Sequence, residues 1–244
     1  MPHKEALIER LKKIQGFTTL VLSENTKQGN SVLGDKMQVL YGKGYIEDVL
    51  CGKKFRISAK SFYQINPVQT EILYNKAIEA AGFTGNEYVI DAYCGIGTIG
   101  MVASHYVDSV IGVELNKDAV RDAVGNAKGN QIKNIRFVCD DAGKFMVKMA
   151  AAAERDKSVR LPDVVLMDPP RSGSDENFLS SLVKMGPEKV VYISCNPETL
   201  ERDVRWLSKH GYKAKGVWPV DMFPFTEHCE AVTLLVKTSE TQTK

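Results

Sequence analysis

Apolar runs alternate with amphipathic stretches over most of this chain. The runs are short, rich in Val, Ile and Leu, and bounded by polar residues, Gly or Pro, as buried strands are. Helical spacing is found between most of them and also in residues 68–81, ahead of the first run. The predicted strands are residues 88–92, 109–114, 135–139, 164–168, 189–194, 212–220 and 231–236.

This order of elements predicts the fold class. Strands that alternate with helices form a mostly parallel sheet with helices on both faces, so residues 61–237 are predicted to be an α/β domain with a doubly wound, seven-stranded sheet. Residues 1–60 are predicted to be a small α+β segment, too small to bury a core alone. This segment is expected either to pack on the α/β domain or to belong to a larger module. Its predicted elements are a helix around residues 7–14, a strand at 18–22 and short strands within 37–57.

Composition narrows the class of protein. The 244 residues are 43% hydrophobic, enough for one large core, and the polar end, residues 238–244, is predicted to be a disordered tail. No apolar run approaches the roughly 18 residues of a membrane span, and no signal-peptide pattern is present, so we expect a cytoplasmic protein without membrane contact. Residues 1–60 hold eleven Lys or Arg against six Asp or Glu, which permits a polyanion-facing surface there.

The five cysteines are scattered and form no C-x-x-C pair. We therefore expect reduced thiols, and neither a metal nor an iron-sulfur cluster in this chain. Cys94 and Cys139 lie on or beside predicted buried strands and are expected to be small core residues.

A glycine-rich loop follows the first strand of the α/β domain. Gly95, Gly97 and Gly100 open the next helix, and Glu114 ends the second strand. Glycines let a backbone approach a ligand closely, and an acid in that place accepts hydrogen bonds from ribose hydroxyls, so an adenosine-containing cofactor is expected. The spacing also fits NAD, but Asp91 ahead of the glycines suits a cofactor with a cationic amino acid end. This favours S-adenosylmethionine.

Two further strand ends carry reactive side chains. Asp168-Pro169-Pro170-Arg171 follows the strand at 164–168, and its prolines make a rigid lip that can hold a planar ring beside the cofactor. Cys195 follows the strand at 189–194, and Glu230 precedes the strand at 231–236. A thiol and a carboxylate on neighbouring strand ends can act as nucleophile and base.

Four motifs in this order resemble one family: Asp-x-Tyr-Cys-Gly-x-Gly, Asp-Pro-Pro-Arg, Ser-Cys-Asn-Pro-x-Thr and His-x-Glu. They resemble the S-adenosylmethionine-dependent RNA uracil-C5 methyltransferases over about residues 60–236, together with the entry segment Phe62–Gln69. The resemblance implies a Rossmann-like class I methyltransferase domain, preceded in residues 1–60 by the last part of the family's central RNA-binding domain. It implies Cys195 as nucleophile and Glu230 as base. The implied cofactor-site residues are Gln64, Tyr93, Glu114, Asp141 and Asp168, beside the glycines Gly95 and Gly97.

The chemistry that the resemblance implies explains these residue types. Uracil C5 is a poor carbon nucleophile until a thiolate adds to C6, and a base must later remove the C5 proton. The substrate would be an unpaired or flipped-out uridine in RNA, stacked on aromatic residues. The candidates for stacking are Phe62, Tyr63, Phe223 and Phe225.

Several alternatives stay open at this point. Ser-Cys-Asn-Pro-x-Thr-Leu-x-Arg-Asp and Val-Asp-Met-Phe-Pro resemble the branch that acts on ribosomal RNA, so 23S rRNA is preferred over transfer RNA. The chain differs from the family in lacking a small β-barrel domain, the first half of the central domain and a four-cysteine cluster. It can therefore be a cofactor-binding fragment that is inactive without an RNA-binding region. A methyltransferase that modifies an exocyclic amine through Asp168-Pro169-Pro170, or an NAD oxidoreductase, is the other interpretation.

Overall fold

The computed structural model describes residues 2–26, 33–34 and 36–238. The elements of the N-terminal part are α1 (Lys4–Leu11), β1 (Leu20–Glu24), β2 (Lys36–Tyr41), β3 (Tyr45–Leu50) and β4 (Lys53–Ser58). The remaining elements are α2 (Pro67–Ala81), β5 (Tyr88–Ala92), α3 (Thr98–Ala103), β6 (Ser109–Glu114), α4 (Lys117–Gly129), β7 (Ile135–Cys139), α5 (Ala142–Arg155), β8 (Val164–Met167), α6 (Glu176–Met185), β9 (Lys189–Ser194), α7 (Pro197–Lys209), β10 (Tyr212–Val220) and β11 (Glu230–Lys237).

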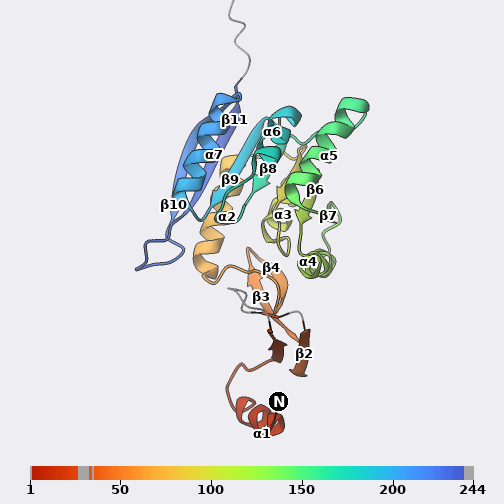
Figure 1. The fold of residues 1–244 in the computed structure, drawn as a ribbon, viewed down its shortest axis with the longest axis vertical. Helices are drawn as coiled ribbons and strands as arrows, with labels where there is room; N and C mark the ends of the chain where they lie inside the picture. Colours follow the sequence, from red (N-terminus) through yellow and green to blue (C-terminus); the bar gives the residue numbers. More distant parts are fainter. Residues whose placement is uncertain (1, 27–32, 35, 239–244) are drawn as a thin grey trace, which may run out of the picture.

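A seven-stranded sheet organises the larger part of the molecule (Figure 1). Its strand order is β10-β11-β9-β8-β5-β6-β7. Neighbours from β9 to β7 pair in parallel, whereas β11 is antiparallel to both of its neighbours. The predicted doubly wound α/β fold is therefore confirmed. Because the chain proceeds from β5 outward in both directions, the carboxyl end of β5 is the switch point where ligands bind in such sheets.

Helices cover both faces of this sheet because its strands are apolar on both sides. All five residues of β5 are buried, and alternate ones join different cores. Val89 packs in the core under α2, α3 and α4, whereas Ile90 packs in the core under α5, α6 and α7. A central parallel strand with two buried faces needs a continuous apolar run, which is what the sequence has.

Side-chain caps start five of the helices that begin near the carboxyl edge of the sheet, whereas α3, which follows Gly97, begins without one. An Asn or Asp side chain accepts a hydrogen bond from a backbone N–H of the first turn, which satisfies a donor that the helix cannot pair internally. Each of these helices therefore begins close to the edge where ligands bind. The capping residues are Asn66 of α2, Asn116 of α4, Asp141 of α5, Asp175 of α6 and Asn196 of α7.

Three expectations need correction. The strand predicted at 164–168 ends at Met167, because Pro169 has no N–H to continue the ladder. The strand predicted at 18–22 lies two residues later, as β1. Cys139 is exposed rather than in the core, since it is the last residue of β7 and β7 is an edge strand. The tail predicted at 238–244 lies, apart from its first residue, outside the described part of the chain.

The β3–β4 hairpin docks on α4 through side chains that replace a neighbouring strand. Asn126 Oδ1 accepts from the backbone N of Arg56 at 2.7 Å, and its Nδ2 donates to the Arg56 carbonyl at 3.1 Å. Asn130 makes the same pair of bonds with the backbone of Lys54. On the apolar side, buried residues of the hairpin, including Phe55, belong to the same core as α2. The hairpin therefore packs on the larger part of the molecule, while the division of the chain at residue 60 stays a prediction.

Replacing Asn126 by Ala is expected to destabilise the protein by about 2–3 kcal/mol, because two backbone groups of Arg56 lose their partner. Urea unfolding measures the change. The matched control is Asn75→Ala on the exposed face of α2, which should change the free energy of unfolding by less than about 0.5 kcal/mol. Equal stability of the two variants would show that the Asn126 contacts carry no energy.

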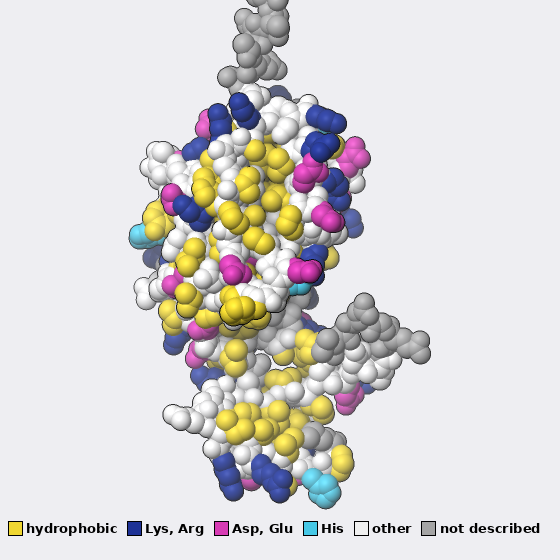
Figure 2. Space-filling view, turned by 90° about the vertical axis from the view of Figure 1, so that its left-hand side faces the viewer, with side chains coloured by type: hydrophobic (Ala, Val, Ile, Leu, Met, Phe, Trp, Pro, Cys, Tyr) yellow, Lys and Arg dark blue, Asp and Glu magenta, His cyan; other side chains and the backbone are white. Residues whose placement is uncertain are grey.

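Hydrophobic side chains also gather on the side of the molecule that carries β10 and α2 (Figure 2). Ile72 of α2 and Val217 of β10 are each about half exposed. Lys213 and Lys215 are exposed on the same edge strand, and lysines on an edge oppose pairing with other strands. Among the described residues, no helix has the length and apolar character needed to cross a membrane.

Candidate active site

Most of the predicted site residues lie at or just beyond the carboxyl ends of the parallel strands. Gln64 instead is buried just before α2, and Glu230 opens β11, which runs in the opposite direction and so begins at this same edge. The candidate site has a thiol side, with Cys195 and Glu230, and a cofactor side, with the glycine loop and Glu114. The two sides meet at β8 and β5. The order along the sheet is Glu230 on β11, Cys195 after β9, Asp168 after β8, Tyr93, Gly95 and Gly97 after β5, Glu114 on β6 and Asp141 after β7.

The glycine loop leaves room above Gly95. Its backbone N donates to Glu114 Oε2 at 3.0 Å, and among the described residues nothing lies within 4 Å of a Cβ built on Gly95. Gly95 and Gly97 both have a positive φ, +56° and +80°, and a Cβ on Gly97 would also lie 2.7 Å from the Phe137 ring. The turn therefore favours glycine at both positions, and Gly95 in addition leaves room for a ligand.

Asp91 provides a test of whether a cationic cofactor fits. Its carboxyl is 1% exposed, and Oδ2 accepts from the backbone N of Gly100 at 2.9 Å. For Oδ1 the described residues offer no hydrogen-bond partner. Burial, and the nearby Asp168 and Glu114 charges, hold the pKa of Asp91 well above its usual range. A buried acceptor without a donor fits a ligand that brings a positive group, such as the amino acid end of S-adenosylmethionine.

Tyr93 is held by two residues that no sequence pattern links with it. Its φ of +64° turns the side chain out of the strand direction. Its hydroxyl lies 3.3 Å from Ser174 Oγ, and its ring centroid lies 5.4 Å from that of Phe178. Burial raises the pKa of Tyr93 to about 12, so the hydroxyl stays protonated as a hydrogen-bond donor or acceptor.

Asp141 has a hydrogen bond and lines a cavity, whereas Gln64 is characterised by its burial. Asp141 Oδ1 accepts from the backbone N of Lys144 at 2.9 Å and so caps α5, and Asp141 also lines a cavity of about 370 Å³ between the starts of α5 and α6. Gln64 is 7% exposed at the start of α2. Their roles toward a cofactor stay predictions.

Cys195 and Glu230 adjoin the same end of the β9–β11 ladder. Ser194 pairs with Ala231 at that end, Cys195 follows Ser194 and Glu230 precedes Ala231, and the Glu230 charge acts on the thiol. Glu230 is 3% exposed, and the described residues supply no hydrogen-bond partner for its Oε2. A free acceptor beside a thiol at a ligand-binding edge is the arrangement expected for a base near a nucleophile.

Nearby charges set the protonation of this pair. Burial raises the pKa of the Cys195 thiol, and the Glu230 and Asp168 charges raise it further, whereas the Arg171 guanidinium lowers it. Burial also raises the pKa of Glu230, and Arg171 again opposes this. Arg171 is therefore the one cation acting on both groups in the described part of the site, and it favours their charged forms.

The buried Asp168 carboxyl makes the folding stability depend on pH. Burial, with a contribution from the Glu230 charge, raises its pKa to about 7. In the unfolded chain an aspartate has a pKa of about 4. The folded protein therefore keeps a proton that the unfolded chain loses, so folding stability falls as the pH rises from about 4 to about 7 and stays reduced above that range.

The Asp168→Asn variant is thus expected to be more stable than the wild type by about 1–3 kcal/mol near pH 8, with the gain disappearing at about pH 4. Thermal unfolding across this range tests the expectation. Asp221→Asn, at an exposed position beyond β10, serves as the control and should leave the pH dependence unchanged. A stability gain that is constant with pH would mean that the carboxyl charge is not its cause.

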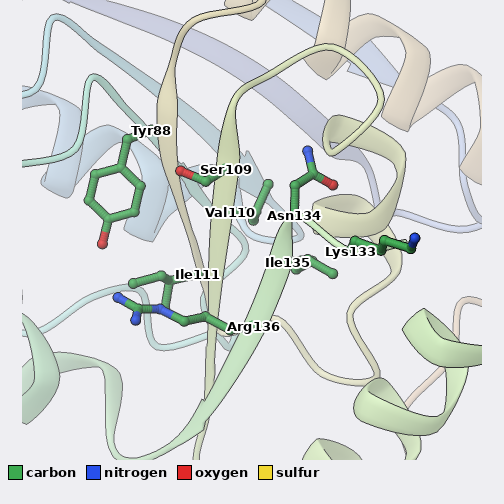
Figure 3. Close-up of a pocket in the computed structure, with 8 residues that line it drawn as sticks. All are labelled: Tyr88, Ser109, Val110, Ile111, Lys133, Asn134, Ile135 and Arg136. Atoms are coloured by element: carbon green, nitrogen blue, oxygen red, sulfur yellow. The ribbon is translucent and has the colours of Figure 1, made fainter. Parts of the chain in front are cut away.

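Another groove lies away from this site (Figure 3). Tyr88, Ser109 and Ile135 line it from the first residues of β5, β6 and β7, so it begins at the opposite edge of the sheet. Asn134 beside it is used structurally, since its amide donates to the carbonyls of Ser104, Val107 and Asp108. This residue of the groove is therefore engaged in holding the loop ahead of β6. No group of three or more His, Cys, Asp or Glu suited to a metal ion is found in the described ranges.

The doubly wound sheet, with its glycine loop and acidic residues at the carboxyl edge, defines a protein of the S-adenosylmethionine-dependent α/β methyltransferase class. Within that class, residues 28–238 match the model of the tRNA (uracil-5-)-methyltransferase family, and the chain belongs to that family. This confirms the family resemblance, and it sets aside the NAD oxidoreductase hypothesis.

Relatives of known sequence agree with this assignment. An uncharacterized RNA methyltransferase of Halalkalibacterium halodurans is 48% identical over 96% of this chain and 50% of its own length. One from Caldanaerobacter subterraneus is 46% identical over 96% of this chain and 51% of its own length. The chain therefore spans about half the length of the curated relatives it matches.

A solved structure shows the same fold. The crystal structure of Pyrococcus abyssi tRNA (uracil-54, C5)-methyltransferase, in complex with S-adenosyl-L-homocysteine, is 31% identical in sequence with a TM-score of 0.73. The alignment covers 90% of this chain and 51% of that one.

Proposed function

We propose that this chain is the catalytic part of an enzyme that transfers a methyl group from S-adenosylmethionine to C5 of a uridine in RNA. The observation that carries the proposal is that Cys195 and Glu230 adjoin the same end of the β9–β11 ladder, where the described residues leave the buried Glu230 Oε2 without a hydrogen-bond partner. A methyltransferase that modifies an amine needs no thiol there, whereas the poor nucleophile C5 does. Membership of the uracil-5 methyltransferase family supports the same reaction.

The cofactor side of the edge would hold S-adenosylmethionine. Asp91 offers a buried acceptor for its amino group, Gly95 allows close approach, and Glu114 is placed where a ribose is bound in such folds. The cofactor supplies an electrophilic methyl group at a positively charged sulfur. The remaining proposed binding residues are Gln64, Tyr93, Asp141 and Asp168.

In the proposed first step, Cys195 adds as a thiolate to C6 of the uracil. A carbon–sulfur bond forms, the C5–C6 π electrons move onto C5 and the C4 carbonyl, and C5 becomes nucleophilic. The neighbouring carboxylates oppose ionisation of the thiol, so Arg171 has to favour it. The rate is therefore expected to rise with pH through the neutral range.

In the proposed second step, after C5 has taken the methyl group with loss of that group's bond to the cofactor sulfur, Glu230 accepts the C5 proton. The electrons of the C5–H bond re-form the C5–C6 double bond, the C6–sulfur bond breaks, and Cys195 leaves as a thiolate. The unsatisfied Oε2 is available for this proton. Its raised pKa brings the carboxyl closer to neutrality than a free glutamate, which strengthens it as a base.

The substrate we propose is an unpaired or flipped uridine in structured RNA. The sequence resemblance supports 23S rRNA, whereas the Pyrococcus abyssi relative acts on tRNA, so transfer RNA is the alternative target. Of the four stacking candidates, Phe62 and Phe225 are 71% and 109% exposed, while Tyr63 and Phe223 pack against the core. The two exposed rings are therefore the better candidates for contacts with RNA bases.

The test is to incubate the protein and S-adenosylmethionine with RNA that contains 5-fluorouridine and to measure intact mass under denaturing conditions. Fluorine at C5 blocks the last proton removal, so a methylated protein–RNA adduct is the expected result. Ribosomal and transfer RNA are compared as carriers of the analogue. Cofactor binding without an adduct would contradict C5 chemistry for this chain, and the same test on a full-length relative would separate an amine-type enzyme from a fragment that needs a further RNA-binding region.

A further inference from the structure

Arg202 and Asp203 of α7 lie against the loop that follows Asp168, and the proposed mechanism gives them no part. Asp203 is 1% exposed, whereas about half of the Arg202 side chain is exposed. A fully buried carboxylate is costly unless it is paired and hydrogen-bonded. The contacts of this pair indicate its role.

Each oxygen of Asp203 has a hydrogen-bond partner. Oδ2 accepts from the backbone N of Ser174 at 2.9 Å and from the Tyr192 hydroxyl at 2.8 Å. Oδ1 accepts from Arg202 Nε at 2.8 Å. Since Tyr192 belongs to β9, the strand that leads to Cys195, the carboxylate joins the central sheet to the loop.

Other side chains of α7 and its cap bind the same loop. Arg202 Nη2 donates to the carbonyls of Ser172 and Ser174 at 2.9 and 3.2 Å. Asn196 Nδ2 and Thr199 Oγ1 each donate to the Arg171 carbonyl at 3.1 Å. The backbone of residues 171–174 is therefore held from one side, by the helix that begins just after Cys195.

Gly173 of this loop has no room for a side chain. Its φ is +74°, and a Cβ at this position would lie 2.5 Å from Arg202 Nη2 and 2.7 Å from Asp203 Oδ2. The loop packs in direct contact with Arg202 and Asp203. A substitution of either side chain is therefore expected to move the loop.

The two ends of this loop reach the two sides of the candidate site. At one end, Ser174 Oγ lies 3.3 Å from the Tyr93 hydroxyl on the cofactor side. At the other end, the Arg171 guanidinium acts on Cys195 and Glu230. Asp203 and Arg202 hold the segment between them.

We propose that Arg202 and Asp203 are positioning residues that connect the cofactor side and the thiol side of the site through the loop at 171–174. This inference rests on the proposed function, in which Tyr93 contacts the cofactor and Cys195 is the nucleophile. The pair keeps Ser174 against Tyr93 and, by binding Ser172, limits the movement of the adjacent Arg171. Neither residue touches a reacting atom.

The test uses Asp203→Asn, which keeps an oxygen for Ser174 and Tyr192 but turns an amide N–H₂ toward Arg202. Two quantities are measured without RNA. The first is the midpoint of the pH profile for iodoacetamide alkylation of Cys195, followed by mass spectrometry of its peptide. The second is the dissociation constant of S-adenosylhomocysteine.

Asp203→Asn is expected to change both quantities. The alkylation midpoint should move to higher pH, with alkylation near neutrality about threefold slower or more, because release of Ser172 by Arg202 lets the adjacent Arg171 move and weakens its effect on the thiol. Cofactor binding should weaken about fivefold or more, because Arg202, displaced by the amide, releases the Ser172 and Ser174 carbonyls and leaves Ser174 less firmly held against Tyr93. Arg171→Ala should move the midpoint alone, and Ser174→Ala should weaken cofactor binding alone. Arg205→Ala, which removes an exposed ion pair with Glu201 on the same helix, is the control without effect.

A folded Asp203→Asn protein with wild-type midpoint and cofactor affinity would overturn the proposal and leave the pair a purely structural role. If that variant does not fold, Arg202→Gln answers the question, since it leaves the bonds of Asp203 to Ser174 and Tyr192 in place. Wild-type values of both quantities in that variant would overturn the proposal equally. Both readouts are independent of methyl transfer, so they separate failure of this inference from failure of the proposed RNA reaction.

Discussion

The Cys195→Ala variant is expected to lose methyl transfer to RNA by at least about 10⁴-fold, because removal of a covalent nucleophile disables the whole reaction sequence. Cys229 is the nearest thiol in sequence to Glu230, but its Sγ donates to the backbone carbonyls of Glu230 at 3.2 Å and Val220 at 3.9 Å, so it is not expected to replace Cys195. Transfer of radiolabelled methyl from S-adenosylmethionine to RNA measures the loss. Binding of S-adenosylhomocysteine should remain close to that of the wild type, because Cys195 lies on the thiol side of the edge.

Cys229→Ala is the matched control for this experiment. Cys229 is half-buried, also a free thiol, and adjacent to Glu230, yet it lies outside the proposed mechanism. Its replacement should leave methyl transfer unchanged within about twofold. Full activity of the Cys195→Ala variant would rule out C5 chemistry through this thiol, and it would favour the amine-type reaction at Asp168-Pro169-Pro170.

The sequence was sufficient to find the strand ends and the residues on them. Cys195 and Glu230 could be identified because each adjoins an apolar run whose length and composition indicate a buried strand. It was harder to predict from the sequence that Cys195 and Glu230 come together at one end of a ladder. This arrangement depends on β11 inserting antiparallel between β10 and β9 with Ala231 in register with Ser194, and a period-two pattern does not specify which strands become neighbours.

Polar contacts between distant segments were not predictable in the same way. Asp203 and Ser174 are 29 residues apart, and Tyr93 and Ser174 are 81 apart. Asn126 is a polar residue on a helix that faces partly to solvent, yet it pairs with β4. Single polar residues carry no periodic signal, so their partners are known only once the chain is folded.

The electrostatic state of the site is also a property of the fold. A sequence shows that Asp168, Glu230 and Asp91 are acidic, but not that burial raises the pKa of all three. Three acids with raised pKa values, of which only Glu230 has Arg171 acting on it, make a site that added positive charge would stabilise. A sulfonium cofactor brings such charge, so its binding should stabilise the fold more as the pH rises above about 7, where Asp168 ionises.

The Glu230→Gln variant is expected to stop the reaction after the first half, and so to accumulate protein covalently attached to ordinary, unfluorinated RNA. The glutamine side chain cannot accept the C5 proton, and elimination of Cys195 depends on that step, so turnover should fall by about 10²- to 10⁴-fold while addition to C6 still occurs. Intact mass under denaturing conditions should show protein, RNA and one added methyl group.

Folding is not at risk in this variant, because removal of a buried carboxylate with a raised pKa should increase stability above neutral pH. Glu227→Gln provides the control: Glu227 is exposed on the loop before β11, and its replacement should give ordinary turnover and no adduct. A Glu230→Gln protein that turns over at the wild-type rate would assign the base elsewhere. An inactive variant with no adduct would contradict the proposed role of Glu230 in removing the C5 proton. It would show that Glu230 is needed for the addition of Cys195 to C6 instead.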